Sequence, residues 1–258
     1  MITPVWRECR LTAEDWDRWA ASGAPVAVSL AEVEHFEQVV APKRGMTAVD
    51  LTCGTGQWTR QLAAWGMTVA GYDYANESLR QAESGAAHAG LSYALWDIVA
   101  EPIPTDLVPG QIDVVTCRYG LLYLEPGRLL TDIGRWLKPA GVFYALVRVG
   151  GTRARRCPTD PRVDSAARLD HLSFDAELPE ESITRIGAGW ARREVHPTGA
   201  SDRAIVLSGY DPPPDEHFVL GEPDSRAYRA LVRQPTAAHT TNQIVRSEGH
   251  AARPPEMP

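Results

Sequence analysis

Between residues 46 and 149 the sequence alternates short apolar runs with segments of helical period, and this alternation restricts the chain to few architectures. The apolar runs occupy 46–51, 67–72, 91–96, 112–117 and 142–149. The helical segments occupy 57–65, 76–88 and 127–137, whereas 97–111 has the composition of a loop with a short helix. Short strands separated by helix-sized segments predict βα repeats, and hence a parallel sheet with helices on both faces.

Two further apolar runs follow, at 190–197 and 203–209. A helix should precede them, from Pro179 to about Gly187, because a proline near the start and acidic residues in the first turn favour helix initiation. We therefore predict an α/β fold over residues 46–210, with a Rossmann-like, seven-stranded and mostly parallel sheet that has helices on both faces.

The segment before this domain has helical period over residues 12–40. Trp16 and Trp19 fall on one helical face, and Ser29–Glu32 has the pattern of a capping box, which marks the start of a helix. We interpret residues 1–45 as an N-terminal helical lid or cap over the domain.

Two other segments are expected to lie outside the sheet and its helices. The insertion 150–175 is long enough to cover a molecule bound beside the sheet. Residues 211–258 form a proline-rich extension without helical or strand period, and we expect it to be largely disordered from about residue 234.

Composition limits the partners of the chain. Lys and Arg number 26 against 33 Asp and Glu, a net charge of −7, and the only basic cluster, Arg153 to Arg156, is interpreted as a solvated loop. No apolar run approaches the ~20 residues of a membrane span, and a signal peptide is not recognisable. The four cysteines form no disulfide framework. We expect a cytoplasmic protein that binds neither nucleic acid nor membrane, with its oligomeric state left open.

The loop after the first predicted strand carries the strongest signal for a ligand. Its sequence, VDLTCGTG over residues 49–56, ends at the start of a predicted helix. Gly54 and Gly56 allow a sharp turn and a close approach of a ligand to the backbone, and the helix presents free N–H groups to it. A purely structural turn is the alternative, but the place after the first strand favours a nucleoside-type ligand.

Two residues of this loop distinguish between nucleoside ligands. A dinucleotide fingerprint needs a third glycine at position 59, which is a threonine. Asp50 would repel a pyrophosphate, whereas it would attract a ligand that carries an ammonium and a sulfonium group. Both features favour S-adenosylmethionine over NAD.

Acidic residues at the ends of the next two strands fit the rest of such a ligand. Asp73 lies near the ~20-residue offset of a carboxylate that accepts both ribose hydroxyls, although it could also serve as a helix N-terminal acid. Asp97 could accept the adenine amine between Trp96 and Ile98, and a simple loop carboxylate is an equally good interpretation.

Taken in order, these motifs resemble the class I S-adenosylmethionine-dependent methyltransferases over roughly residues 29–210. The family's acid-x-Gly-x-Gly-x-Gly loop corresponds to Asp50, Thr52, Gly54 and Gly56, and the segments DVVTCRYGLLYL (113–124) and LKPAGVF (137–143) are similar as well. Thr52 departs from the pattern, as does Ala140, where a glycine is common. A threonine at φ > 0 would be strained by about 1 kcal/mol or more, and we expect instead that position 52 tolerates a side chain.

The resemblance implies S-adenosylmethionine as cofactor, S-adenosylhomocysteine as product and in-line transfer of the methyl group. The cofactor-binding residues are then expected to be Asp50, Thr52, Cys53, Gly54, Gly56, Asp73, Tyr74, Trp96, Asp97, Ile98 and Arg118. The substrate-binding residues are expected to be Tyr119, Tyr123, Trp16 and Trp19. His171 is the candidate general base, although a surface loop histidine is the simpler interpretation. No metal site is expected, because no histidine has a partner at ligand spacing.

The leading functional hypothesis is methylation of a small-molecule acceptor in secondary metabolism, an association suggested by the Arg-, Ala- and Pro-rich composition. One alternative is a peptide or protein methyltransferase in which Arg153 to Arg156 bind an acidic substrate. Another is a non-catalytic, methyltransferase-like partner protein. Oxygen, nitrogen and carbon acceptors use the same sheet and loop, so the acceptor atom stays open.

Overall fold

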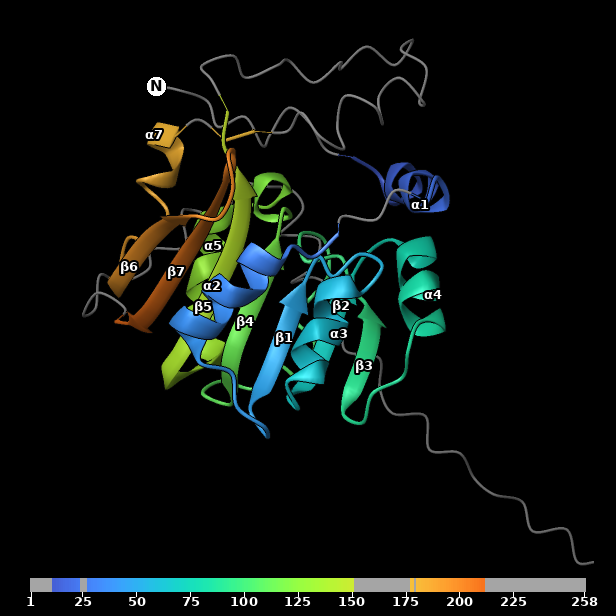
Figure 1. Cartoon of the computed structure of the whole chain (residues 1–258), viewed down its shortest axis with the longest axis horizontal. Helices are drawn as coiled ribbons and strands as arrows, with labels where there is room; N and C mark the ends of the chain where they lie inside the picture. The colour runs from blue at the N-terminus through green and yellow to red at the C-terminus, as the bar shows by residue number, and fades with distance from the viewer. Residues whose placement is uncertain (1–10, 24–26, 151–176, 179, 212–258) are drawn as a thin grey trace, which may run out of the picture. The chain divides into compact units, whose positions relative to one another are not determined.

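The computed structural model describes residues 11–23, 27–150, 177–178 and 180–211 (Figure 1). Within this part a seven-stranded sheet has the order β3-β2-β1-β4-β5-β7-β6. Its strands are β1 (Thr47–Leu51), β2 (Thr68–Asp73), β3 (Leu91–Leu95), β4 (Ile112–Arg118), β5 (Leu137–Arg148), β6 (Trp190–Pro197) and β7 (Asp202–Tyr210). The first five pair in parallel, and β7 runs antiparallel to both β5 and β6. The predicted Rossmann-like, mostly parallel sheet is confirmed.

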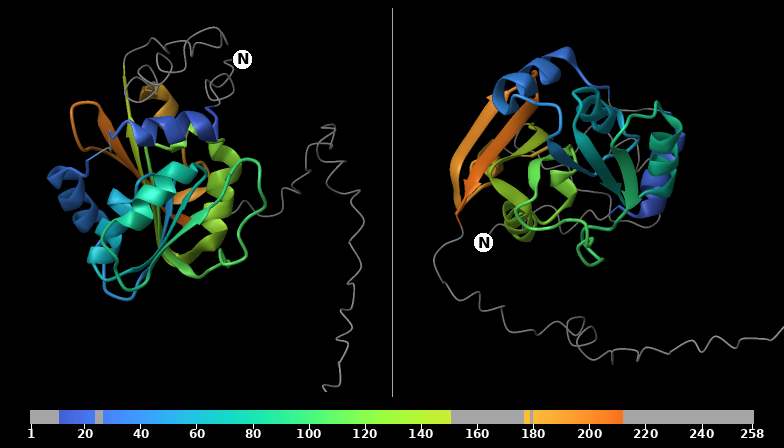
Figure 2. Two further views of the ribbon diagram at one scale, coloured as in Figure 1. Left: turned by 90° about the vertical axis from the view of Figure 1, so that its right-hand side faces the viewer. Right: turned by 90° about the horizontal axis from the view of Figure 1, so that it is seen from below.

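Helices cover both faces of this sheet (Figure 2). On one face, α2 (Leu30–Val40) and α3 (Gln57–Ala64) bury a cluster that includes Phe36 and Trp58 against β-strand residues such as Tyr144. On the other face, α5 (Pro126–Trp136) packs Ile133 into the second core cluster. Apolar side chains on both faces explain why the strands read as continuous apolar runs rather than as alternating ones.

The N-terminal helical segment divides into two helices with different positions. The helix α1 (Ala13–Ala21) starts at Thr12 and lies beside α4 (Asn76–Ser84), at the end of the sheet toward which the arrows of β1 to β4 point (Figure 1). The Asp17 carboxylate accepts the backbone N–H of Glu77 at 2.7 Å, which caps the first turn of α4. The helix α2 instead packs on the sheet face, so the two helices hold different parts of the domain.

Three predicted helical segments differ from the structure. The segment 76–88 is shorter than expected, since α4 ends at Ser84. The expected short helix in 97–111 is wrong: Asp97 accepts the N–H groups of Val99 and Ala100 and caps a single turn, and Pro102 follows. The helix expected to run to about Gly187 is also shorter, because α7 spans Glu180–Ile183 and turns follow.

The early end of α7 has a tertiary cause. The guanidinium of Arg193, on β6, donates to the backbone carbonyls of Ile183 and Ile186 at 2.7 and 2.6 Å. Because the last carbonyls of a helix need donors from outside it, this side chain satisfies them and lets the chain turn toward β6. No pattern local to the helix indicates such a contact.

Replacing Phe36 with alanine tests the packing of α2 on the sheet. The ring is fully buried among aromatic side chains, so the cavity left by Phe36→Ala should lower the free energy of unfolding by about 3–5 kcal/mol. The matched control on the same helix is Leu30→Ala, which removes a side chain that is 72% exposed and should change it by no more than about 0.5 kcal/mol. Equal effects of the two variants in urea denaturation would contradict this packing.

Candidate active site

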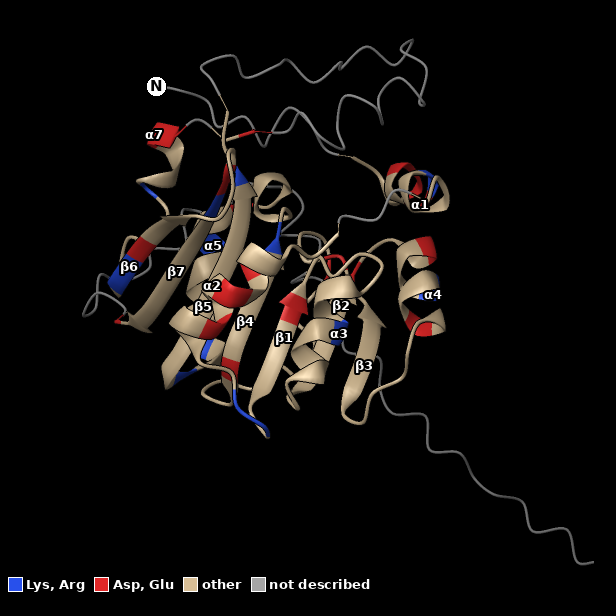
Figure 3. Cartoon of the chain, viewed as in Figure 1, with Lys and Arg blue, Asp and Glu red and all other residues tan. Residues whose placement is uncertain are grey.

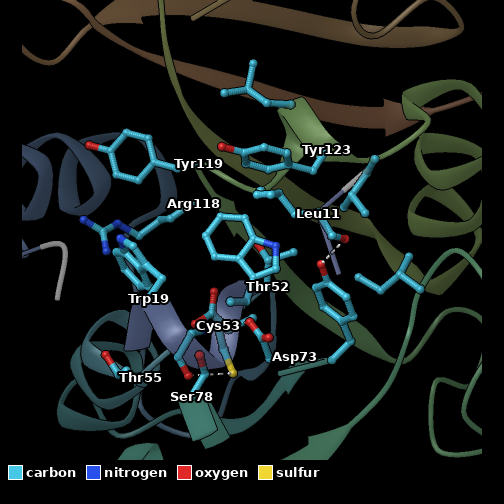
Figure 4. A pocket seen from close by; sticks show the side chains of 18 of the residues that line it. Leu11, Trp19, Thr52, Cys53, Thr55, Asp73, Ser78, Arg118, Tyr119 and Tyr123 are labelled. Carbon is cyan, nitrogen blue, oxygen red and sulfur yellow. Dashed lines mark hydrogen bonds between the residues drawn. The ribbon is translucent and has the colours of Figure 1, made fainter. Parts of the chain in front are cut away.

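A cavity of about 180 Å³ opens at the carboxyl ends of the central strands, which is where ligands bind in open α/β sheets (Figure 4). It brings together residues from α1, the loop after β1 and the ends of β2, β3, β4 and β5. The lining consists of Leu11, Trp16, Trp19, Asp50, Thr52, Cys53, Gly54, Thr55, Gln57, Trp58, Asp73, Tyr74, Ser78, Trp96, Asp97, Ile98, Val99, Arg118, Tyr119, Gly120, Leu122, Tyr123, Leu124 and Arg148.

The loop after β1 has left-handed backbone at three positions, with φ of 54° at Thr52, 54° at Gly54 and 76° at Gly56. The expectation that position 52 would hold its side chain without this conformation is wrong, and the threonine bears the strain of about 1 kcal/mol or more. A Cβ at Gly54 would meet nothing within 4 Å, so the backbone here is open to the cavity. Gly56 lies outside the lining, and a Cβ there would come 2.4 Å from the hydroxyl of Tyr93.

Asp50 lies beneath the loop and is almost completely buried, with 1% of its surface exposed. Its two carboxylate oxygens accept hydrogen bonds from the hydroxyls of Thr59 and Thr116, each at 2.7 Å. Burial raises the pKa of Asp50 to about 6, although both hydroxyls favour the charged form. The threonine at position 59, where a dinucleotide fingerprint would have glycine, is thus a direct partner of this acid.

Asp73 connects two loops at the floor of the cavity. One carboxylate oxygen accepts the backbone N–H of Gly54 and the other that of Ala75, both at 2.9 Å. Burial raises the pKa of Asp73, while the backbone N–H groups oppose that rise. Each carboxylate oxygen has a second lone pair, so the group can accept further hydrogen bonds from a ligand in the cavity.

The end of the cavity beside β3 is mostly apolar. Trp96 is buried, packs edge-on against Tyr72 and donates its indole N–H to the carbonyl of Pro102. Ile98 lines the same end, and the hydroxyl of Tyr74 donates to the carbonyl of Leu11, so this tyrosine ties the start of α1 to the rim (Figure 4).

A buried ion pair joins α2 to the end of β4. Arg118 donates to both oxygens of Glu32, at 2.6 and 2.9 Å, and the two side chains are 9% and 2% exposed. Burial raises the pKa of Glu32 and the guanidinium opposes that rise. The capping-box pattern indicated the start of α2 correctly, since Ser29 accepts the N–H of Glu32. It gave no sign of the arginine.

Aromatic side chains from α1 and from the segment after β4 form a wall of the same cavity. The ring of Trp16 stands nearly perpendicular to those of Trp19 and Tyr123, at centroid distances of 5.8 and 5.2 Å. Tyr123 is half-buried here, and this burial raises its pKa to about 12. The four residues expected to bind a substrate therefore line the same cavity as the expected cofactor residues, Gly56 excepted.

Arg148 is a lining residue that the sequence analysis missed. It ends β5, pairs with Asp202 at 3.3 Å, and its guanidinium carbon lies 5.5 Å from the ring centre of Tyr119. Arg118 lies 5.3 Å from the same ring centre, so Tyr119 has two guanidinium neighbours. Arg148 could have been predicted from the rule that sites lie at the carboxyl ends of parallel strands, because it ends β5. His171, the candidate base, lies outside the described residues.

The described residues offer no other obvious ligand chemistry. Among them, no three His, Cys, Asp or Glu side chains gather in a way that could hold a metal ion, and no helix is long and apolar enough to cross a membrane. Figure 3 shows Lys and Arg dispersed over strands, helices and loops rather than clustered on one element.

Comparison with known proteins agrees with this geometry. Residues 49–145 match a family described as a methyltransferase domain. Over 111 residues the chain is 34% identical to the ubiquinone biosynthesis O-methyltransferase of Methylococcus capsulatus. The matched segment covers 43% of this chain and 46% of that protein. The chain therefore spans about half the length of this curated relative.

Solved structures share the fold. A SAM-dependent methyltransferase from Aquifex aeolicus superposes with a TM-score of 0.55 at 17% identity, over 77% of this chain and 98% of that one. Phosphoethanolamine N-methyltransferase 2 from Haemonchus contortus, in complex with S-adenosyl-L-methionine, does so with a TM-score of 0.50 at 20% identity, over 71% and 42%. The sequence matches and the shared fold together support a class I S-adenosylmethionine-dependent methyltransferase domain over residues 49–145, with S-adenosylmethionine as its cofactor.

The raised pKa of Asp50 makes stability depend on pH. Because the folded state holds the proton up to about pH 6 and the unfolded state releases it near pH 4, wild-type stability should fall as pH rises through this window. In Asp50→Asn the amide can accept from one threonine and donate to the other, and no charge is buried. The free energy of unfolding of the variant, minus that of wild type, should rise by roughly 2 kcal/mol between pH 4 and pH 7.

Thr59→Val supplies the opposite variant for the same measurement. It removes a hydrogen bond that favours the charged carboxylate, so it should destabilise the protein more at pH 7 than at pH 4. A difference between Asp50→Asn and wild type that stays constant over this pH range would contradict the raised pKa.

Proposed function

We propose that this chain transfers a methyl group from S-adenosylmethionine to a small-molecule acceptor. The observation that carries the proposal is one cavity at the strand ends in which an open glycine loop and the Asp73 carboxylate face an aromatic wall. The loop and the acid fit the donor, and the wall gives the acceptor a dry place beside it.

The side chains present fit the donor part by part. The lone pairs of Asp73 suit the two ribose hydroxyls, and the open backbone at Gly54 suits the methionyl portion above it. Trp96 and Ile98 supply apolar surface for the adenine ring. Asp50 contributes from below, because its oxygens already hold two threonine hydroxyls. We therefore assign it to shaping the loop rather than to direct contact.

When bound, S-adenosylmethionine would supply an electrophilic methyl group to the acceptor's lone pair, and its sulfur would leave with the bonding electron pair. The residues of the chain orient the acceptor and shield the reaction from water. Trp16 and Trp19 exclude water from above, and Tyr119 and Arg148 orient the acceptor at the end of β4 and β5. His171 remains the proposed base for an acceptor that must lose a proton.

A hydroxylated small molecule is the acceptor class that we favour. The curated relatives are named for an O-methylation in ubiquinone biosynthesis, and the cavity lies beneath α1, which leaves less room for a folded peptide substrate. A role in secondary metabolism rests on composition alone and stays a prediction, as do a cytoplasmic location and the absence of nucleic-acid and membrane partners.

The Asp73 contact is tested by calorimetric titration with S-adenosylhomocysteine. Asp73→Asn cannot accept both backbone N–H groups and two ribose hydroxyls, so affinity should fall about 10- to 100-fold. The matched control is Asp211→Asn, an exposed acid distant from the cavity lining, which should bind like wild type. Wild-type affinity in Asp73→Asn would exclude the assigned ribose contact.

The acceptor class is tested with methyl-labelled S-adenosylmethionine and a panel of phenols, catechols, primary amines and an acidic peptide. Label should appear on hydroxylated aromatic compounds. Label on the peptide alone would favour the peptide alternative. Binding of S-adenosylhomocysteine without transfer to any panel member would favour the non-catalytic alternative.

A further inference from the structure

Two residues that line the cavity have a backbone conformation that their side chains disfavour. Thr52 follows β1 with φ 54°, and Tyr119 follows β4 with φ 57°. Left-handed backbone is costly for a β-branched or bulky residue and persists only where the surroundings enforce it. Since neighbouring parallel strands β1 and β4 end side by side, the two strained residues face the same space.

Gly120 follows Tyr119 in the chain, and the side chain of Thr52 packs against it. A Cβ added at Gly120 would come 2.0 Å from the Oγ1 of Thr52 and 2.6 Å from both its Cβ and its Cγ2. The threonine therefore occupies the volume that a side chain at position 120 would need. Its hydroxyl also donates to the carbonyl of Leu51 at 2.6 Å and lies 3.6 Å from the sulfur of Cys117.

The same backbone unit carries Tyr119. The N–H of Tyr119 donates to the carbonyl of Leu146 on β5 at 2.7 Å, which fixes one side of the residue. Its ring has the guanidinium groups of Arg118 and Arg148 as neighbours. On the other side, the Cys117 thiol accepts the N–H of Gly120, and the carbonyl of Gly120 accepts the N–H of Tyr123 at 2.9 Å. The side chain of Thr52 is the contact that reaches this peptide from the loop after β1.

We propose that Thr52 is a positioning residue: its side chain, wedged against Gly120, holds the Tyr119–Gly120 peptide and so sets the place of Tyr119 beside the acceptor. The side chain thereby connects the donor loop to the acceptor side of the cavity. Glycine at position 52 would suit the left-handed backbone and the donor, but it would leave Tyr119 without this support. The kinetic part of this inference rests on the proposed methyl transfer.

The alternative is that Thr52 only fills space. The two hypotheses are distinguished by removing the side chain at position 52 and adding one at position 120. The variants are Thr52→Gly, Thr52→Ser, Gly120→Ala and the double variant Thr52→Gly/Gly120→Ala. Each is measured for S-adenosylhomocysteine affinity, for thermal unfolding, and for kcat and KM with the panel compound that wild type methylates fastest.

Thr52→Gly should keep S-adenosylhomocysteine affinity within about threefold while kcat falls about tenfold or more, because a misplaced acceptor reacts slowly. Thr52→Ser retains the hydroxyl and part of the wedge, so it should recover most of that loss. Gly120→Ala should lower the unfolding temperature, and adding Thr52→Gly should restore it, since the Cβ then has room.

Additive effects in the double variant would overturn the proposed wedge, as would an unchanged kcat in Thr52→Gly. A loss of S-adenosylhomocysteine affinity as large as the loss of kcat would also overturn it, because Thr52 would then act through the donor. Failure of wild type to bind S-adenosylhomocysteine would contradict the proposed function instead, while the unfolding temperatures would still decide whether the wedge exists.

Discussion

The carboxylate of Asp73 accepts one backbone N–H from the loop after β1 and one from the turn after β2, and the site depends on these two hydrogen bonds. They hold the open backbone at Gly54 at a fixed distance from an acid that can still accept from a ligand. Burial opposes the charge, and the two N–H groups offset part of that cost. A single side chain thereby organises the floor of the cavity, and in the proposed function the same side chain accepts the ribose hydroxyls.

Other buried charges connect this floor to the rest of the domain. Asp50 supports the loop from below through two threonine hydroxyls, and the Glu32–Arg118 pair joins α2 to the end of β4. Losing one member of such a pair would leave an uncompensated buried charge, which is why these contacts fix the arrangement of the elements. The helix α1 lies outside the sheet layers: it contacts α4 and the cavity rim, and its Trp16 and Trp19 line the cavity.

Features that depend on local pattern could be predicted from the sequence. Apolar runs placed the strands, and acids at strand ends placed Asp73 and Asp97 at one edge, because parallel strands end together. Contacts between residues far apart in the sequence could not be predicted. Glu32 and Arg118 are 86 positions apart, and Arg193, whose hydrogen bonds end α7, lies on the later strand β6. The prediction for the backbone at Thr52 was wrong for a related reason. Its backbone is left-handed, and its side chain packs against Gly120, 68 positions away, a contact that no motif in the loop reveals.

A crystal structure of the full chain with S-adenosylhomocysteine is the most direct test of the central claim. The account predicts ribose hydroxyls within about 3 Å of the Asp73 oxygens, the methionyl portion over Gly54, and the indole rings of α1 above it. A ligand bound elsewhere, or one in this cavity whose ribose does not touch Asp73, would contradict it.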